Sequence, residues 1–277
     1  MKIEKRNADG LTEKEFLAQY NPGDYKRPSV TVDMMVLRMK KDLSCMQILL
    51  IKRKNHPDIG CWALPGGFIE INESAYQAAC RELEEETGLT GVYLEQLYTM
   101  SQPDRDPRMR VIDISYIALL PHDYSVQEQA GDDAEDATWF DITFKKDKIL
   151  FDNADKNVRI DYKLIPQSFK NGVITIDNFI PVQNKEEKLA FDHAQIILEG
   201  LMRLQSKVMY SDIAFNLVPL EFTLPDLQKV YEIICEKDLY KANFREHIKN
   251  KIIPTGKQIK PISSIRSSAG YKYRKQS

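Results

Sequence analysis

The sequence predicts an α+β protein in two parts, a larger mixed part over residues 1–210 and a smaller basic part over residues 211–277. Apolar, β-branched segments separated by polar turns indicate strands in the first part. Segments with apolar residues at helical spacing indicate helices among them. From about Tyr210 the pattern changes to short helical segments and a basic tail, and 277 residues suffice for two ordinary domains.

The predicted strands begin with SVTVDMMVLR (29–38) and MQILLIKR (46–53), which are rich in Val, Ile and Leu and are joined by a polar connection. The stretch 145–185 contains NVRIDYKLIP and GVITIDNFIP joined by QSFKNG, which resembles a β-hairpin insertion. Further strands are predicted at 91–100, 110–120 and 137–142.

Helix ends are marked by capping residues. Thr12 and Glu15 have the spacing of a capping box, which predicts a short helix over EFLAQY. A longer helical pattern runs from about Ser74 to Thr87, and Gly88 fits its C-terminal stop. Amphipathic helical spacing returns in LAFDHAQIILEGLMRLQ, residues 189–205.

Composition narrows the setting in which the chain works. Apolar residues make up 43% of it, which suffices for a packed core. The apolar runs are too short for a transmembrane helix, so no membrane partner is expected, and the N-terminus lacks the apolar core of a secretory signal. The four cysteines are scattered without a CxxC pair, which argues against a zinc site or disulfide framework and predicts a reduced, cytoplasmic location.

Charge is distributed unevenly along the chain. The net charge is −2, but residues 237–277 carry eleven Lys and Arg side chains against two acidic ones, a net charge of +9. A basic end on an acidic body is a reason to expect an anionic partner.

Three carboxylates gather on the predicted helix at 74–87. Glu82, Glu85 and Glu86 are related by i, i+3 and i+4, so they share one face of the helix. Such a cluster is ordinarily a solvated acidic surface. Here Arg81 stands four residues before Glu85, and a Gly-Gly pair upstream allows backbone to approach a ligand. Several clustered carboxylates suit Mg²⁺ or Mn²⁺.

The spacing of these residues resembles the Nudix box, which is Gly, five residues, Glu, seven residues, Arg-Glu-apolar, one residue, Glu-Glu, one residue, Gly-apolar. The matching positions are Gly67, Glu73, Arg81, Glu82, Leu83, Glu85, Glu86, Gly88 and Leu89. The resemblance implies a MutT-like Nudix fold, a mixed sheet between helices, with the segment 67–89 holding Mg²⁺ (or Mn²⁺).

The resemblance also implies roles for these residues. Glu82, Glu85 and Glu86 would bind the cations, and the Gly67 carbonyl would add a further ligand. Glu73 and Arg81 would brace the helix, so that Glu85, Glu86, Arg81 and Glu73 form the catalytic set. The implied reaction is hydrolysis of a diphosphate linked to a second moiety, in which metals lower the pKa of the attacking water. A base outside the box would be one of Glu128, Asp132, Asp133 and Glu135, among which the sequence does not choose.

The likeness extends beyond the box. WALPGGF (62–68), PDRDPRMRV (103–111), AGDDAEDATWF (130–140) and LAFDH (189–193) resemble the ADP-ribose branch of the Nudix superfamily. Among its members they are most similar to Nudix-related transcriptional regulators of NAD and sugar metabolism. In those regulators a winged helix-turn-helix domain follows the Nudix domain, and FTLPDLQKVYE with the basic tail resembles it. The resemblance also implies a homodimer.

The residues support a winged helix independently. A helix at 223–236, with Thr223 as N-cap, a second, basic helix at 242–252 and a basic β tail follow in that order. The second helix would enter the major groove of double-stranded DNA while tail cations meet phosphates. The alternatives are a merely soluble surface, a dimerisation arm or a single-strand binder, and Glu246 inside the second helix departs from a basic recognition face. The candidate DNA contacts are Arg245, Lys249, Lys251, Lys272 and Arg274.

For several other side chains the sequence allows two alternative roles. Arg105, Arg108 and Arg110 lie in a turn-forming segment and are either substrate clamps or solvated loop charges. His193 is expected to be a hydrogen-bonded helix residue rather than a metal ligand. Trp62 and Trp139 are expected in the core rather than stacked on a base.

Two functions follow. The first is a Mg²⁺-dependent hydrolase that cleaves a nucleoside diphosphate linked to a sugar, with ADP-ribose as the expected substrate. The second is a DNA-binding transcriptional regulator whose Nudix domain senses ADP-ribose or a sugar metabolite.

Overall fold

The computed structural model describes residues 5–24, 26–124 and 137–275. Its helices are α1 (Glu13–Gln19), α2 (Ala75–Thr87), α3 (His193–Lys207), α4 (Leu224–Cys235) and α5 (Lys241–Ile248), with 3₁₀ turns η1 (Pro22–Asp24) and η2 (Ile213–Leu217). The strands of the first part are β1 (Ser29–Met39), β2 (Met46–Lys52), β3 (Trp62–Ala63), β4 (Gly66–Phe68), β5 (Tyr93–Met100), β6 (Val111–Leu120), β7 (Ala137–Lys145), β8 (Lys148–Asn153), β9 (Val158–Asn171) and β10 (Ile174–Gln183). Those of the second part are β11 (Phe222–Thr223), β12 (Ile252–Ile259) and β13 (Ser268–Tyr273).

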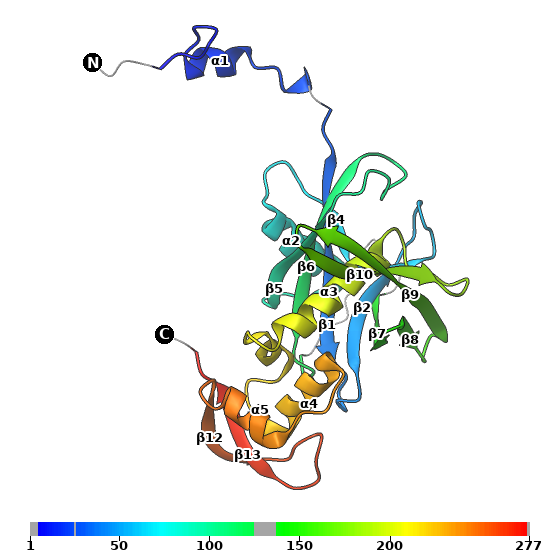
Figure 1. Cartoon of the computed structure of the whole chain (residues 1–277), viewed down its shortest axis with the longest axis vertical. Helices are drawn as coiled ribbons and strands as arrows, with labels where there is room; N and C mark the ends of the chain where they lie inside the picture. The colour runs from blue at the N-terminus through cyan, green and yellow to red at the C-terminus, as the bar shows by residue number, and fades with distance from the viewer. Residues whose placement is uncertain (1–4, 25, 125–136, 276–277) are drawn as a thin grey trace.

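The first part is built on one mixed sheet. Its strands follow the order β10-β9-β8-β7-β2-β1-β6-β5, with β3 paired to β2 and β4 paired to β1. The β1–β6 pair is parallel and the other pairs are antiparallel. Helices α2 and α3 lie on either side of it (Figure 1). The predicted mixed sheet between helices is therefore confirmed.

Strand β1 shows why both faces are covered. Successive side chains of a strand point to opposite faces, so the apolar run Met34–Leu37 supplies residues to two cores. Met34 and Val36 belong to the hydrophobic cluster that contains Leu83 of α2. Met35 and Leu37 belong to the cluster that contains the apolar face of α3.

Helix α2 has the ends that its sequence predicts. The Ser74 side chain accepts a hydrogen bond from the Gln77 backbone, and Gln77 bonds back to Ser74, which completes a capping box. Gly88 takes the left-handed conformation, with φ of 69°, and its N–H donates to the Glu84 carbonyl. These caps fix the register of the acidic helix.

The segment 145–185 extends the main sheet. Strand β8 pairs with β7, β9 pairs with β8, and β9 forms a hairpin with β10 that turns at Gly172. Val173 and Ile174, next to this turn, are exposed. The hairpin thus forms one edge of the sheet rather than a separate unit.

The second part has the arrangement of a winged helix. Strands β11, β13 and β12 form a small antiparallel sheet in that order, beside α4 and α5. Thr223 caps α4 by accepting the Asp226 N–H, as predicted. Leu227 and Tyr231 of α4 lie in the same hydrophobic cluster as Leu201 and Leu204 of α3. The core is therefore continuous across the expected domain boundary at residue 210.

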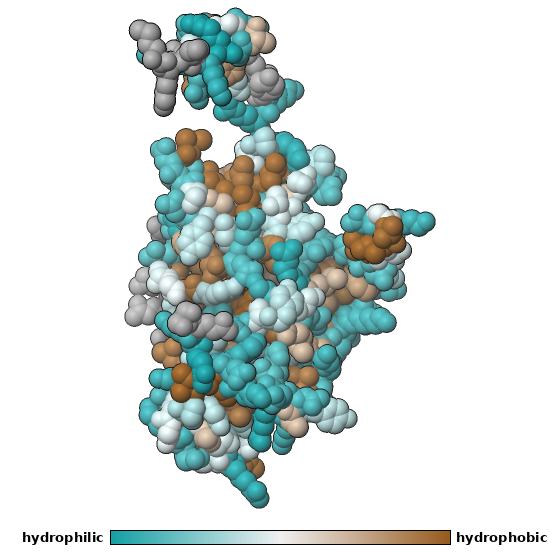
Figure 2. Space-filling model, turned by 60° about the vertical axis from the view of Figure 1, so that its left-hand side comes forward, coloured by the Kyte–Doolittle hydropathy of each residue, from teal (hydrophilic) through white to brown (hydrophobic). Residues whose placement is uncertain are grey.

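The N-terminal segment lies apart from the body. Helix α1 has the predicted capping box between Thr12 and Glu15, but it buries none of its own residues. Phe16, Leu17 and Tyr20 are exposed on it. Figures 1 and 2 show this segment projecting from the rest of the molecule. Among the described residues, no helix is long and apolar enough to span a membrane.

Candidate functional site

Strand β4 brings the two glycines of the box against β1 and α2. Gly66 pairs with Asp33, and Gly67 pairs with Val32. A Cβ atom at Gly66 would lie 2.2 Å from the Val32 carbonyl oxygen, and one at Gly67 would lie 2.2 Å from Glu82 Oε1. Neither position has room for a side chain. Glycine is therefore needed at both positions so that the β4 backbone can approach β1 and Glu82 closely.

Arg81 organises the carboxylates of α2. Its guanidinium donates to Glu73 at 2.7 Å, to Glu82 at 2.8 Å and to Glu85 at 3.0 Å. The bond to Glu73 is the largest of the contacts that raise the pKa of Arg81. Burial raises the pKa of Glu82, against the lowering effect of Arg81. The structure thus brings together four of the predicted box residues, with Glu85 the most exposed of them.

The third helix carboxylate lies on the other side of the glycine loop. Glu86 Oε2 accepts the Gly66 N–H at 2.7 Å. Within the described part of the chain, no group of three acidic, histidine or cysteine side chains is arranged to hold a metal as it stands. The donor chemistry nevertheless fits a hard cation, because the carboxylates of Glu82 and Glu86 lie against Gly67 and Gly66, and Glu85 shares Arg81 with Glu82.

A cavity of about 200 Å³ opens beside this loop. It combines an acidic side at the box with cationic and aromatic groups on other walls. Its lining residues are Thr31, Asp33, Ile51, Arg53, Leu64, Gly66, Gly67, Phe68, Glu86, Arg105, Asp106, Arg108, Phe191 and His193. Its arginines are side chains of the kind that bind phosphate groups.

The three predicted substrate arginines occupy different places. The Arg105 side chain is only 5% exposed and donates to Asp192 at 2.7 and 2.9 Å. The Arg108 side chain is 40% exposed, lines the cavity and donates to Asp106 at 2.7 Å. Arg110 donates to backbone carbonyls of its own loop and strand. Arg105 and Arg110 therefore hold the loop. Arg105 and Arg108 both line the cavity, and Arg108 is the more exposed of the two. Substrate contact by any of the three stays a prediction.

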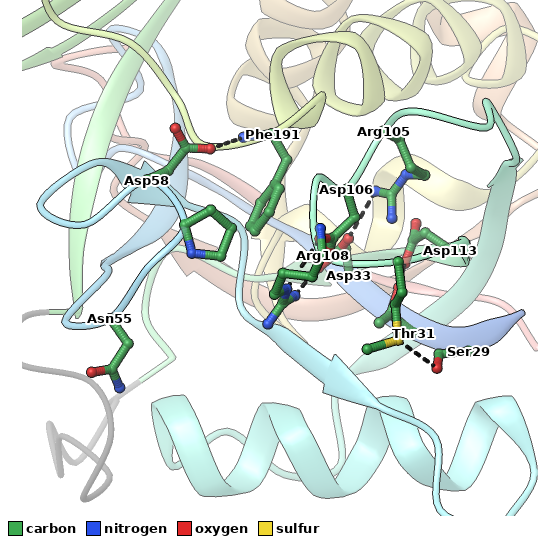
Figure 3. A network of polar contacts seen from close by, with 12 residues as sticks. Ser29, Thr31, Asp33, Asn55, Asp58, Arg105, Asp106, Arg108, Asp113 and Phe191 are labelled. Carbon is green, nitrogen blue, oxygen red and sulfur yellow. Dashed lines mark hydrogen bonds and ion pairs between the residues drawn. The ribbon is translucent and has the colours of Figure 1, made fainter.

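A buried polar network lies under the cavity (Figure 3). Asp33 Oδ2 is 3.5 Å from the Arg105 guanidinium and 3.6 Å from His193 Nε2. Asp113 is fully buried, accepts a hydrogen bond from Ser115, and has a pKa raised by burial and then by Asp33. The sequence analysis missed both aspartates. The available signal was one carboxylate inside each of two otherwise apolar strands.

His193 is the hydrogen-bonded helix residue that the sequence predicts. It is 3% exposed, and its Nδ1 accepts the Leu64 N–H at 2.9 Å. This bond ties the start of α3 to the strand that leads into the glycine loop. Burial lowers the pKa of His193 below its ordinary value of 6.5, so the folded chain keeps the ring neutral.

We expect this histidine to make folding stability depend on pH. Below about pH 6.5 the unfolded chain takes up a proton that the folded chain refuses, so the free energy of unfolding falls as pH drops. The contribution is complete above pH 6.5 and declines below it by up to about 1.4 kcal/mol per pH unit. Urea unfolding across this range should show a shallower decline for His193→Asn, which retains an acceptor. Parallel curves for the two proteins would contradict the assignment.

Both tryptophans pack away from the cavity lining. Trp62 is 2% exposed and meets Phe140 edge-on at 4.9 Å between ring centroids, which confirms its core role. Trp139 packs against the hydrophobic cluster that contains Leu83 of α2. The Arg38 guanidinium carbon lies over its ring, 3.9 Å from the ring centroid. The predicted base candidates Glu128, Asp132, Asp133 and Glu135 lie outside the described residues.

A second, basic groove lies in the C-terminal part. A groove of about 570 Å³ is lined by Arg245 of α5, by Lys249 at the C-cap of this helix and by Arg274 after β13. Lys249 also pairs with Glu246, the acidic residue of this helix. The groove thus gathers three of the five predicted DNA contacts between the second helix and the β tail.

The other two predicted DNA contacts lie elsewhere. Lys251 is 2.9 Å from Asp212, and its side chain is only 19% exposed, so it ties α5 to the segment before η2. Lys272 lines a separate cavity of about 790 Å³ near Asp212 and Tyr273. Their contact with DNA stays a prediction.

Comparison with known proteins identifies two matching domain families. Residues 27–158 match the NUDIX domain, and residues 214–273 match the NrtR DNA-binding winged helix domain. The "ADPR responsive transcriptional repressor NtrR" of Acinetobacter baylyi is 31% identical over 86% of this chain and 78% of its own. The "ADP-ribose pyrophosphatase" of Methanocaldococcus jannaschii is 41% identical over 54% of this chain and 81% of its own.

Solved structures show the same arrangement. A MutT/nudix family protein from Enterococcus faecalis has a TM-score of 0.76 at 30% identity, covering 95% of this chain and 94% of its own. Shewanella oneidensis NrtR, complexed with a 27mer DNA, has a TM-score of 0.64 at 27% identity, covering 88% and 93%. The Nudix domain of that protein, complexed with ADP ribose, has a TM-score of 0.50 at 29% identity, covering 70% and 99%.

Proposed function

Because this chain belongs to the Nudix family, in the group that joins a Nudix domain to an NrtR-type winged helix domain, we propose that it is a DNA-binding transcriptional regulator whose Nudix domain binds ADP-ribose or a similar nucleotide sugar. The observation that carries the proposal is the groove lined by Arg245, Lys249 and Arg274. It lies on a winged helix whose core is continuous with the sheet beneath the polar cavity. A homodimer is expected, since most DNA-binding regulators are symmetric.

A gel-shift titration with duplex DNA from the region upstream of its own gene tests this function. The protein should retard the duplex, and the affinity should fall steeply with salt concentration. ADP-ribose should change that affinity by about 5–150-fold, the range of ordinary coupling between two sites. Absence of binding to any upstream duplex would remove the regulator proposal.

A second proposed function is hydrolysis of the same ligand, and the complete box favours it. Glu82, Glu85 and Glu86 would hold Mg²⁺ or Mn²⁺, which supplies charge neutralisation at the phosphates and a more acidic bound water. Arg81 and Glu73 hold the helix carboxylates in position through the contacts described above. The two functions are compatible, because cleavage of the ligand would end the signal that it carries.

We expect Mg²⁺-dependent release of AMP and ribose 5-phosphate from ADP-ribose, and we expect Glu86→Gln to reduce it at least about 100-fold. The size follows because even groups outside the metal's own ligands contribute about 10–100-fold to such sites. Turnover is measured by chromatography of the products with and without Mg²⁺. The matched control is Glu84→Gln, on the same helix but outside the box pattern. Lack of turnover by the wild type on a nucleotide panel would eliminate the hydrolase and leave the regulator.

A further inference from the structure

Arg53 stands on the cavity wall, directly after β2, and was not among the predicted site residues. Its Nε donates to the Pro57 carbonyl at 2.9 Å, and one Nη donates to the Asn55 carbonyl at 3.4 Å. These two bonds fix the guanidinium by backbone oxygen atoms, which carry no formal charge. Across the described residues, Arg53 forms no ion pair with a carboxylate.

A second guanidinium converges on the same place. Burial lowers the pKa of Arg53, and the neighbouring charge of Arg108 lowers it further. The charge of Arg108 is balanced by Asp106. Asp58, the acid nearest to Arg53 in sequence, is occupied by Lys188 at 2.7 Å. Of the two guanidinium cations, only Arg108 is paired with a carboxylate among the described residues, while Asp58, Asp33 and Asp106 attract Arg53 from a greater distance.

Phe191 orients this wall, and its backbone is strained. Its φ is 49°, a left-handed conformation that is costly for a bulky residue. Asp58 Oδ2 accepts the Phe191 N–H at 2.9 Å and holds the conformation (Figure 3). The ring lies 4.7 Å from the Arg53 guanidinium carbon and 5.9 Å from that of Arg108. Residues kept in such conformations concentrate at ligand sites, where geometry outweighs local stability.

We propose that Arg53 and Arg108 form a clamp for the diphosphate group of the ligand and that Phe191 is the residue that positions Arg53. The ligand class is a nucleotide bridged by a diphosphate, so the inference rests on the function proposed above and deepens it. Phe191 covers a flat face of the Arg53 guanidinium, and Nε and one Nη bond to backbone oxygen. The other Nη donates no hydrogen bond among the described residues, so it can donate to a phosphate oxygen. Glu86 and the glycine loop, which also line this cavity, provide the side at which a metal ion would meet the same phosphates.

Calorimetric titration of the full-length protein tests the clamp. ADP-ribose is one ligand, inorganic pyrophosphate is the probe for the diphosphate alone, and both are titrated in EDTA so that nothing is hydrolysed. Arg53→Gln should weaken both ligands by about 10–100-fold, the value of a charge-assisted contact. The matched control is Arg159→Gln, an exposed arginine on β9, which should stay within about twofold of the wild type.

Phe191→Gly separates positioning from folding. Glycine adopts a positive φ without steric cost, which offsets part of the packing lost with the ring, so the thermal midpoint should fall less than it does in Phe191→Ala, which keeps the backbone strain. Loss of the ring should still weaken ligand binding by about 2–5-fold, the value of an exposed cation–π contact. Unchanged affinity in this variant would remove the positioning role of Phe191.

The outcomes distinguish the clamp from the proposed function. If ADP-ribose binds Arg53→Gln as tightly as the wild type, the clamp is wrong and the proposed function stands. If the wild type binds pyrophosphate but not ADP-ribose, and Arg53→Gln loses the pyrophosphate, the clamp stands and the proposed ligand is wrong. If the wild type binds neither ligand, both proposals fall.

Discussion

Replacing Arg245 and Lys249 together by glutamine is expected to weaken binding to duplex DNA by about 100-fold. Arg245 lies on α5, Lys249 is its C-cap residue, and both line the basic groove together with Arg274. Each contact to phosphate is a hydrogen bond with a charged partner, for which roughly 1.4 kcal/mol is a conservative value. The slope of log affinity against log salt concentration should become shallower by about 1.8. The variant neutralises two fewer phosphates, so its binding releases fewer counterions from the DNA.

Fluorescence anisotropy of a labelled duplex across a salt series measures both quantities. The control carries Lys229→Gln and Lys237→Gln, which remove the same charge from the same domain outside the groove. Equal affinity and equal slope in the groove variant and this control would show that the groove does not bind DNA. Deleting residues 211–277 is a poorer test, because Leu227 and Tyr231 pack in the core that contains α3.

Arg105→Met is expected to lower the free energy of unfolding by about 3–5 kcal/mol, the cost of leaving a buried charge without its partner. The Arg105 side chain is 5% exposed, and its bidentate bonds to Asp192 join the loop after β5 to the start of α3. Asp33, at 3.5 Å, would lose the same cation. Removing the arginine therefore leaves the carboxylates of Asp33 and Asp192 without this cation at the base of the cavity.

Urea unfolding at neutral pH measures this loss. The matched control is Arg108→Met, whose side chain is 40% exposed and whose ion pair should be worth about 1 kcal/mol or less. Asp192→Asn added to Arg105→Met should recover part of the loss, because it removes one stranded charge. If Arg105→Met instead leaves stability unchanged and weakens ADP-ribose binding, Arg105 contacts the ligand, which is one of the two interpretations that its sequence context allows, and does not serve to hold the loop.

Local patterns in the sequence were sufficient for the elements and the box. Ser74 and Gly88 mark the ends of α2 because caps act within one helical turn. The contacts of Arg105 were not predictable, because Asp192 lies 87 positions away and meets it only after the sheet and α3 have assembled. The same holds for Lys251, whose partner Asp212 precedes the winged helix and takes it away from the basic groove.

Arg53 shows a different limit of sequence reading. It follows an apolar strand, where a basic residue is ordinarily a solvated strand end. Its place at the cavity depends on the left-handed conformation of Phe191 and on the hydrogen bond from Phe191 to Asp58. Neither of these features can be predicted from the spacing of residues in the sequence. Long-range packing therefore decided which arginines face the cavity.

The hydrophobic cluster shared by α3 and α4 has a consequence for how mutations act on this chain. Two units that share a core cannot lose it separately, so they melt in one transition instead of two. A ligand held in the cavity then protects the winged helix from unfolding by mass action, although it touches none of its residues. Conversely, a truncation such as Tyr231→Ala would weaken nucleotide binding from a distance, by shrinking the fraction of molecules in which the cavity exists at all.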